Sequence, residues 1–491
     1  MKLTQKIFSA KERNNMLAIF ASRRVRLATL IAILASVVGA GTALLAGPGT
    51  AFAAAADEAF SKTSVITVPG GLNSFDIGFV DAQLGLYFLA DRTNATVDQV
   101  KTSDNSITQL AKGSFVGVQP GSNTSGPNGV ITANDHSEVW AADGVCAPAP
   151  GKTCPPESVG TSRVRVIDLE TGKVTHNIDT GGQRRADELC EDPQHHVVLV
   201  ANDDDLDLLL TFISTETYKV IKQIKLDGSD SNAMNIKATN GIEQCQWSPR
   251  TRKFYLAIPQ VGGTPGANDT PGEVLEINPA SMKIEKVFPI DFGFVGAHGT
   301  TPATADCLGP QGLAIGPQRE ILLGCSNSGA GTVIINELDG SLVRNLPGLN
   351  GNDEVWYNPG DNHYFLAGGN HNVSTPTPGP ILGVVDQSGD TDVEDASPTT
   401  KTGSHSVAAD PVKNQVYVPV NAANPLCGGT PALNGCIAVF TAANDDPGVC
   451  TGNGTPAHGK GKQGDPVFLR AVCPNNNAGH PGNNGHGNNN G

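Results

Sequence analysis

The sequence predicts an all-β protein, a seven-bladed β-propeller closed by pairing of its first strand with its last blade. Short apolar runs alternate with Gly- and Pro-rich turns along most of the 491-residue chain, and long helical periodicity is absent. One pattern recurs seven times: a strand, a turn that often contains Pro, a second strand that ends in small residues, a third strand and a polar turn.

The second strand of each copy is the clearest element of the repeat, because it is a run of aromatic and aliphatic residues. These strands are expected at 86–91, 138–143, 197–202, 253–257, 320–325, 363–367 and 415–420. Seven copies in about 380 residues correspond to the roughly 40–50 residues that form one blade. Six or eight blades are the alternatives, because the insertions at 144–160, 260–272 and 422–435 blur the boundaries.

The two ends of the repeat complement each other. The seventh copy has a third strand at 436–441 and then continues into polar residues, so it lacks a fourth strand. The segment 64–69 precedes the first copy and has no partner of its own. Placing it as the outer strand of the last blade completes that blade and removes an exposed strand edge.

Two similar hairpin turns, at 168–174 and 337–343, carry Gly where a positive φ is needed. Together with Val200-Ala201-Asn202 and the x-Pro turns, they resemble the YVTN-type repeats of secreted bacterial, lactonase-like propellers. The resemblance covers most of residues 62–441, and the long Pro/Gly insertions depart from it. It implies the fold and no single activity, since such propellers serve many roles.

Residues 1–56 are typical of a signal peptide. They contain seven basic residues and one acidic residue, an uncharged apolar run at 27–45, and the small-residue pattern Ala51-Phe52-Ala53. An uncleaved membrane anchor is the alternative, and Ser22-Arg23-Arg24 leaves twin-arginine and general export both open. We expect an exported protein, periplasmic, in the cell envelope or extracellular, that is not inserted in a membrane after cleavage.

The chain is therefore divided into a signal peptide at 1–56, a propeller at 57–445 and a tail at 446–491. After Cys473 the tail consists almost wholly of Asn, Gly and His. Such a composition cannot bury a core, and disorder is expected there.

All ten cysteines follow the signal peptide, and an even number in an exported chain favours disulfides. The pairs suggested by spacing are Cys146/Cys154, Cys427/Cys436, Cys450/Cys473, Cys307/Cys325 and Cys190/Cys245. Spacing alone leaves the connectivity open.

The charge excludes some partners. Without residues 1–56 the chain has 26 basic and 47 acidic residues. Nucleic acid binding is not expected, because phosphate contacts need Lys and Arg surfaces, whereas cations are attracted. We expect a monomer that binds a small molecule, a glycan or a protein.

An acidic ring is expected round the propeller axis. The residues five positions before the first turn of each copy are mostly polar and share one level: Asp76, Asp187, Glu243, Gln311, Asp353 and His405. The second copy has Gly129 there, with Asn128 beside it, and Glu188, Gln244 and Glu354 follow their ring residues directly.

Carboxylates that face one space repel one another and need compensation. Ca²⁺ or another divalent cation would supply it, since Ca²⁺ takes six to eight oxygen ligands. The alternative is a hydrated polar channel in which Arg184 or Arg185 lies near the ring.

Two resemblances bear on the chemistry of this ring. Gluconolactonase-type propellers hold a divalent ion with Glu, Asn and Asp, which implies Asp76, Asn128, Glu243 and Asp353 as metal ligands. Streptogramin lyases, also propellers, pair a metal with His and Glu, which implies catalytic roles for His405 and Glu354. The resemblance lies in residue type and approximate placement.

The leading function is an exported binding propeller, and a divalent-metal-dependent lactonase or lyase is the alternative. Besides Asp187 and Gln311, two loop histidines are candidate ligand-binding residues, His298 and His371. The sequence has no G-x-S-x-G motif, phosphate loop or c-type haem motif. No complete catalytic constellation is evident, and this favours the binding function.

Overall fold

The computed structural model describes residues 59–442, apart from 148–152, 156, 204–207, 293–306, 327–330, 347–348, 372–380, 388–392, 395–399, 401–403, 423 and 429–433. Several predictions fall outside these residues: the signal peptide at 1–56, the tail at 446–491, the Cys450/Cys473 pair and the loop residue His298. Those predictions stay untested.

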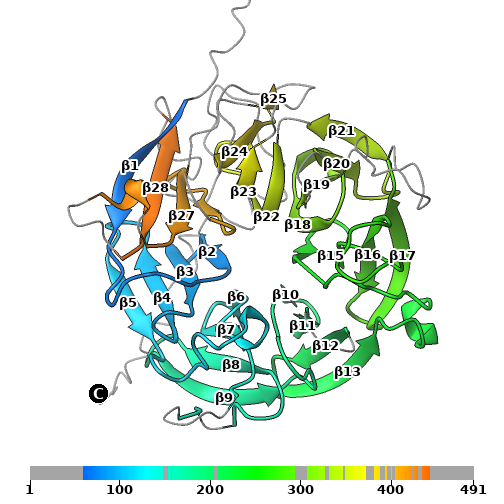
Figure 1. Ribbon diagram of the computed structural model, residues 1–491, viewed down its shortest axis with the longest axis horizontal. Helices are drawn as coiled ribbons and strands as arrows, with labels where there is room; N and C mark the ends of the chain where they lie inside the picture. The colour runs from blue at the N-terminus through cyan, green and yellow to red at the C-terminus, as the bar shows by residue number, and fades with distance from the viewer. Residues whose placement is uncertain are drawn as a thin grey trace, which may run out of the picture. The chain divides into compact units, whose positions relative to one another are not determined.

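The described residues form seven four-stranded antiparallel sheets arranged round one axis (Figure 1). The first blade contains β2 (Gly78–Asp81), β3 (Leu86–Asp91), β4 (Thr96–Lys101) and β5 (Ile107–Leu110). The second contains β6 (Val130–Ala133), β7 (Glu138–Asp143), β8 (Arg163–Asp168) and β9 (Lys173–Asp179). The third contains β10 (Leu189–Asp192), β11 (Val197–Asn202), β12 (Leu209–Ser214) and β13 (Lys219–Lys225). The fourth contains β14 (Cys245–Ser248), β15 (Lys253–Ile258), β16 (Gly272–Asn278) and β17 (Lys283–Ile290).

The remaining blades follow the same order. The fifth contains β18 (Pro310–Ile315), β19 (Glu320–Cys325), β20 (Thr332–Asn336) and β21 (Leu342–Leu346). The sixth contains β22 (Leu349–Asn358), β23 (His363–His371), β24 (Ile381–Asp386) and β25 (Val393–Glu394). The seventh contains β26 (Ala408–Asp410), β27 (Gln415–Val420), β28 (Cys436–Ala442) and β1 (Phe60–Ile66). The seven-bladed prediction is confirmed, and the alternatives of six and eight blades are wrong.

Helical structure in the described part of the chain is limited to four short 3₁₀ turns: η1 (Ser122–Thr124), η2 (Ser231–Ala233), η3 (Pro317–Arg319) and η4 (Pro425–Cys427). Among the described residues, no helix is long and apolar enough to cross a membrane.

Each blade begins at the axis and runs outward. In Figure 1 the first strands of the blades, such as β6, β10 and β22, lie near the centre, and β5, β9, β13 and β17 lie at the rim. The second strands are almost wholly buried because a neighbouring blade covers each face of a sheet. This arrangement explains why they were the clearest signal in the sequence.

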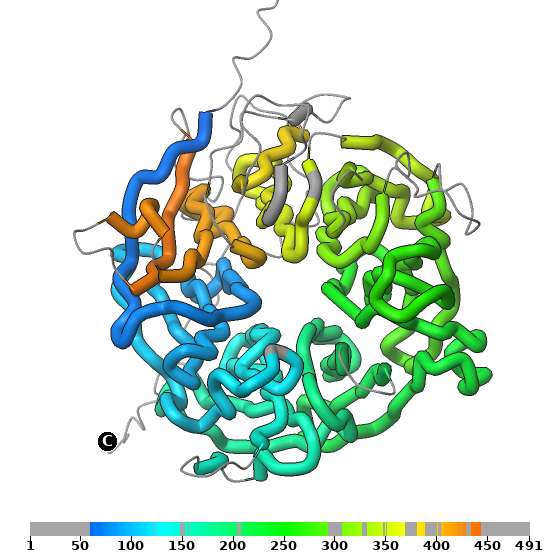
Figure 2. The backbone as a smooth tube through the Cα atoms, viewed as in Figure 1, coloured from blue at the N-terminus to red at the C-terminus, as the bar shows by residue number. Residues whose placement is uncertain are grey.

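The chain closes the ring with its first strand. The sheet order of the seventh blade is β1-β28-β27-β26, so β1 is its outer strand. Its register runs from Phe60 opposite Ala442 to Ile66 opposite Ile437. Figures 1 and 2 show this first strand, in blue, beside the orange last strands. The strand begins four residues before the expected segment and ends at Ile66, ahead of the turn at Gly70 and Gly71, which both have positive φ.

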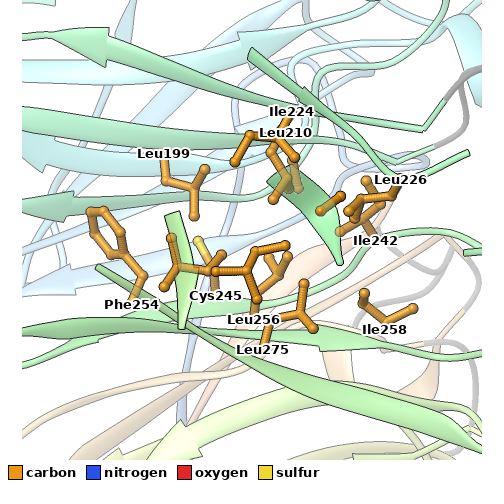
Figure 3. Close-up of a cluster of buried hydrophobic side chains, with 14 of the residues drawn as sticks. Leu199, Leu210, Ile224, Leu226, Ile242, Cys245, Phe254, Leu256, Ile258 and Leu275 are labelled. Atoms are coloured by element: carbon orange, nitrogen blue, oxygen red, sulfur yellow. The ribbon is translucent and has the colours of Figure 1, made fainter. Parts of the chain in front are cut away.

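The core lies between adjacent sheets. Figure 3 shows one such cluster, in which Leu199 and Leu210 of the third blade gather with Leu256 of the fourth. The disulfide between Cys190 and Cys245 joins the inner strands of the same two blades. Packing between neighbours is what stabilises a blade, since a single sheet cannot bury both of its faces.

Four disulfides lie within the described residues: Cys146–Cys154, Cys190–Cys245, Cys307–Cys325 and Cys427–Cys436. These are four of the five pairs suggested by spacing. Two of them close the insertions after β7 and β27, which replace short turns of the repeat. Disulfides in this number indicate an oxidising compartment.

We predict that the closing strand contributes several kcal/mol to stability. Phe60 is buried, with its ring edge-on to Phe365 of the sixth blade at a centroid distance of 5.2 Å. Phe60→Ala should lower the free energy of unfolding by about 3 kcal/mol, as measured by urea denaturation. The control Ser61→Ala, at an exposed position of the same strand, should change it by less than about 0.5 kcal/mol. Equal effects of the two substitutions would contradict this role of Phe60.

Candidate functional site

The ring residues of the first four blades occupy equivalent backbone positions. Each lies two residues before the inner strand of its blade: Asp76, Asn128, Asp187 and Glu243. The backbone N–H of each donates to the carbonyl oxygen of an alanine at 2.9–3.0 Å: Ala90, Ala142, Ala201 and Ala257. The alanine before the last residue of each second strand thus marks the level of the ring. We call this end of the channel the first mouth.

A close approach of two blades explains why the second copy has glycine beside its ring residue. The N–H of Gly129 donates to the carbonyl oxygen of Asp187 at 3.0 Å. A Cβ atom on Gly129 would lie 2.0 Å from that oxygen, which no side chain permits. Asn128 therefore supplies the polar side chain of this blade, and its amide donates to the Ala186 carbonyl at 2.7 Å.

Two guanidinium groups compensate the carboxylates. Arg92 is buried, forms an ion pair with Asp76, and donates from Nε to Oδ1 of Asn128 at 3.0 Å. Arg185 reaches Asp76 at 3.0 Å, Asp187 at 2.8 Å and Asp203 at 3.3 Å. The expectation that Arg184 or Arg185 lies near the ring therefore holds for Arg185.

The ring expected from the sequence included neither Arg92 nor Asp203. Both residues directly follow the second strand of their blade, after Asp91 and Asn202. That position leads back toward the axis, and Asp203 accepts from the Ile242 N–H at 2.9 Å. A charged residue directly after the second strand is the signal that could have found both.

The charges divide the ring into two environments. Burial alone would raise the pKa of Asp76, but Arg92, Arg185 and His405 outweigh it and hold that pKa well below its usual range. Burial raises the pKa of Asp187 and of Glu243, and the neighbouring carboxylates raise both further. Asp76 is thus a stably ionised group, whereas Asp187 and Glu243 are destabilised as anions.

Three carboxylates come together beside Arg185. One oxygen from each of Asp187, Asp203 and Glu243 lies within 4.8 Å of the others. We call these residues the carboxylate group. Asp187 is 1% exposed, and its Oδ1 atom has no hydrogen-bond partner in the described part of the chain. Gln311 donates to Oε1 of Glu243 at 3.0 Å and so orients it.

Below the ring, a second layer of polar side chains spans the channel. Glu188 of the third blade hydrogen-bonds to Glu354 of the sixth, and burial, the largest cause, raises the pKa of both. Gln244 of the fourth blade donates to the Val355 carbonyl at 3.1 Å and accepts from the Leu313 N–H at 2.7 Å. We call Glu188, Gln244 and Glu354 the crossing layer.

The remaining predicted residues lie as follows. His405 stacks on Phe75, with centroids 5.1 Å apart, and its Nε2 lies 3.1 Å from Oδ1 of Asp76. The Glu354 carboxyl contacts Glu188 instead, and only its backbone N–H reaches the His405 carbonyl, at 3.0 Å. Asp353 faces the same space, since its charge raises the pKa of Glu243. His371 ends β23, and its side chain lies outside the described residues.

The other end of the channel is lined mainly by aromatic, aliphatic and uncharged polar residues. A pocket of about 240 Å³ lies where the inner strands end, lined by Phe79, Asp81, Thr132, His136, Gln246, Ile315, Trp356 and Tyr357 with six other residues. We call it the second mouth. Sequence reasoning did not find it, because its residues come from turns and strand ends of several blades.

No protein-family model matches the sequence, and no curated protein matches it. Solved structures share the fold. A chain of "Crystal Structure of Mitotic Checkpoint Complex" is 12% identical, with a TM-score of 0.50 over 82% of this chain and 98% of that chain. "Crystal structure of RRP9 WD40 repeats" is 10% identical, with a TM-score of 0.49 over 78% and 98%. At these identities the likeness concerns the fold alone, so the YVTN-type and lactonase-like resemblance stays a prediction.

We predict that the glutamate pair of the crossing layer makes the protein less stable as pH rises. Its folded-state pKa values are raised, so above the ordinary value of 4.5 the folded state binds more protons than the unfolded chain. The free energy of unfolding should therefore fall with rising pH until the folded pKa values are passed. Glu354→Gln, which mimics the protonated acid, should flatten this decline between about pH 5 and pH 8.

Denaturation in the presence of a chelator measures the decline without interference from metal ions. The exposed Glu216→Gln is the control and should keep the wild-type slope. An unchanged slope in Glu354→Gln would show that the pair holds no extra proton.

Proposed function

We propose that this protein is an exported binding propeller whose first mouth holds a cation. The observation that carries the proposal is a charge imbalance among the described residues at that mouth. Five carboxylates, those of Asp76, Asp187, Asp203, Glu243 and Asp353, face two guanidiniums, those of Arg92 and Arg185. A cation would relieve the repulsion that raises the pKa of Asp187 and Glu243. The signal sequence and the disulfides support export.

The carboxylate group is the place we assign to the cation. Asp76 and Asn128, two of the ligands implied by the gluconolactonase resemblance, are both engaged by Arg92. By contrast, one buried oxygen of Asp187 has no hydrogen-bond partner within the part of the chain that the structure describes. Carboxylate oxygens supplemented by water suit Ca²⁺ or another divalent ion. A small molecule, a glycan or a protein would then bind over this mouth, where His405 is 36% exposed.

We predict that Ca²⁺ or another divalent ion binds to the carboxylate group and raises the melting temperature. At a hundredfold excess over Kd the gain is about 2.7 kcal/mol. Asp203→Asn keeps the acceptor for the Ile242 N–H but removes one carboxylate, and it should weaken binding at least about tenfold in calorimetry. Asp353→Asn removes the same charge outside the group and should have a smaller effect.

Two results would contradict this assignment. One is the absence of both heat and thermal shift with Ca²⁺, Mg²⁺, Mn²⁺ and Zn²⁺. The other is a larger loss of affinity in Asp353→Asn than in Asp203→Asn, which would move the ion toward the ligand set implied by the resemblance. The melting temperature of each variant in chelator shows whether it is folded.

A divalent-metal-dependent lactonase or lyase is the second candidate. It is favoured by His405, whose Nε2 faces Asp76 while its other ring nitrogen has no partner among the described residues. A divalent ion at the carboxylate group would polarise a substrate carbonyl and activate water. His405 is then placed to move a proton near that mouth, and Asp76 keeps the imidazole oriented. Glu354 is a less suitable acid–base group because Glu188 engages its carboxyl.

For this second candidate we predict turnover of simple lactones, followed by pH-stat titration. Glu243→Gln should abolish both metal binding and turnover, because it removes a carboxylate of the group. His405→Gln should abolish turnover and leave metal binding within about threefold of wild type. Lactone turnover that persists in both variants would remove the hypothesis, and metal binding without turnover would leave the binding function alone.

A further inference from the structure

The second mouth is a small pocket in which apolar and polar groups alternate. Its volume of about 240 Å³ lies below the roughly 300–1,000 Å³ of pockets for drug-sized ligands. It therefore suits a ligand of one ring. The crossing layer separates the pocket from the ring of carboxylates along two inner strands. Gln244 lies between Glu243 and the pocket residue Gln246, and Glu354 lies between Asp353 and the pocket residue Trp356.

One wall of the pocket is aromatic. Phe79 and Trp356 are both half-buried, and their rings meet edge to face at a centroid distance of 5.7 Å. Ile315 and Tyr357 continue this wall. Both residues also belong to buried hydrophobic clusters between blades, and this packing holds the wall in place. Such a surface accepts the apolar face of a ring.

Two hydrogen-bond donors in the pocket have no protein acceptor among the described residues. Gln246 accepts from the Ile315 N–H through Oε1 at 2.9 Å, and this contact fixes its amide so that Nε2 is the free donor. The indole N–H of Trp356, another lining residue, makes no hydrogen bond within the described residues and is the second. A hydrocarbon ligand would displace water from these donors without replacing the hydrogen bonds of that water. The donors therefore favour a ligand that carries hydrogen-bond acceptors.

A pair of residues from two blades supplies a third polar group. His136 Nδ1 lies 2.5 Å from Oδ2 of Asp81. That carboxylate is saturated, since it also accepts from Thr132 Oγ1 at 2.7 Å and from two backbone N–H groups at 3.0 Å. Asp81 therefore orients the imidazole, and the Nε2 edge is left for a ligand.

The turn that carries His136 is unusual. Asn134, Asp135 and His136 have φ values of 55°, 57° and 60°, three consecutive left-handed residues without glycine. The Asn134 N–H donates to the Glu191 carboxylate at 3.0 Å and anchors the turn. The turn also lacks the proline that follows Asp192 and Asp410 in the equivalent turns. Backbone strain of this kind persists where the surroundings fix a side chain for a purpose.

We propose that the second mouth binds one neutral sugar ring, the terminal residue of a glycan or a free monosaccharide. Among the described lining residues only Asp81 and His136 are charged, and they compensate each other. A neutral ring with an apolar C–H face and hydroxyl acceptors matches the aromatic wall, the two free donors and the His136 edge. This site is separate from the first mouth and does not depend on the proposed function there.

The test uses methyl β-glucoside, methyl β-galactoside, methyl α-mannoside, N-acetylglucosamine and xylose, with phenol and indole as neutral aromatic controls. Binding is followed by saturation-transfer NMR of each probe and by tryptophan fluorescence of the full mature protein. We expect saturable binding of at least one sugar. Free sugar and the end of a glycan are distinguished by comparing the methyl glycoside with a disaccharide that ends in the same residue.

Variants locate the binding. Gln246→Glu keeps the acceptor for Ile315 and removes the free donor, and Trp356→Phe keeps the ring and removes the indole N–H. Each should weaken the best sugar at least about tenfold. His136→Gln should weaken it as well. His195→Gln is the matched control, because His195 forms the same 2.5 Å contact with Asp192 outside the pocket lining.

Three results would overturn the proposal: no saturation by any sugar up to its solubility limit, sugar binding that is unchanged in Gln246→Glu and Trp356→Phe, or binding of phenol or indole without sugar. The last result would assign the pocket to an aromatic ligand. Ca²⁺ binding to the same preparations reports on the first mouth independently, so failure at one mouth is distinguishable from failure at the other.

Discussion

The structure depends on closure of the ring by β1. Each blade buries its faces against two neighbours, so an open ring would expose the faces of the first and last blades together with the edge of β28. Pairing β1 with β28 removes that edge. Phe60 of β1 also packs against Phe365, so the closing strand contacts the sixth blade as well. Closure in turn brings the first strands of all seven blades round one axis.

That constraint creates the electrostatic problem at the first mouth. The inner strands approach so closely that Gly129 has no room for a side chain beside Asp187. Polar residues at one level of these strands must then face a common space. Arg92 and Arg185 reduce the repulsion but do not remove it, since the pKa values of Asp187 and Glu243 stay raised. This uncompensated repulsion is the reason why we propose a cation as the ligand of this mouth.

The sequence could predict the parts that repeat. Blade number and the level of the ring follow from the period, because Ala90, Ala142, Ala201 and Ala257 mark the same backbone position in four copies. Arg92 and Asp203 were missed because polar residues were expected at the axis only ahead of each inner strand, whereas these two directly follow a second strand. The second mouth was also out of reach: the contact of His136 with Asp81 joins two blades, and no single copy of the repeat contains it.

The crossing layer gives the two mouths separate chemistry. A channel open from end to end would share its water and counterions between both mouths. Glu188 and Glu354 instead hydrogen-bond to each other across it, and Gln244 donates to the Val355 carbonyl. Burial raises the pKa of both glutamates. The first mouth can therefore have an excess of carboxylates while the second mouth is lined by aromatic and neutral groups. The two ligands that we propose, a cation and a neutral ring, therefore have separate sites with the crossing layer between them.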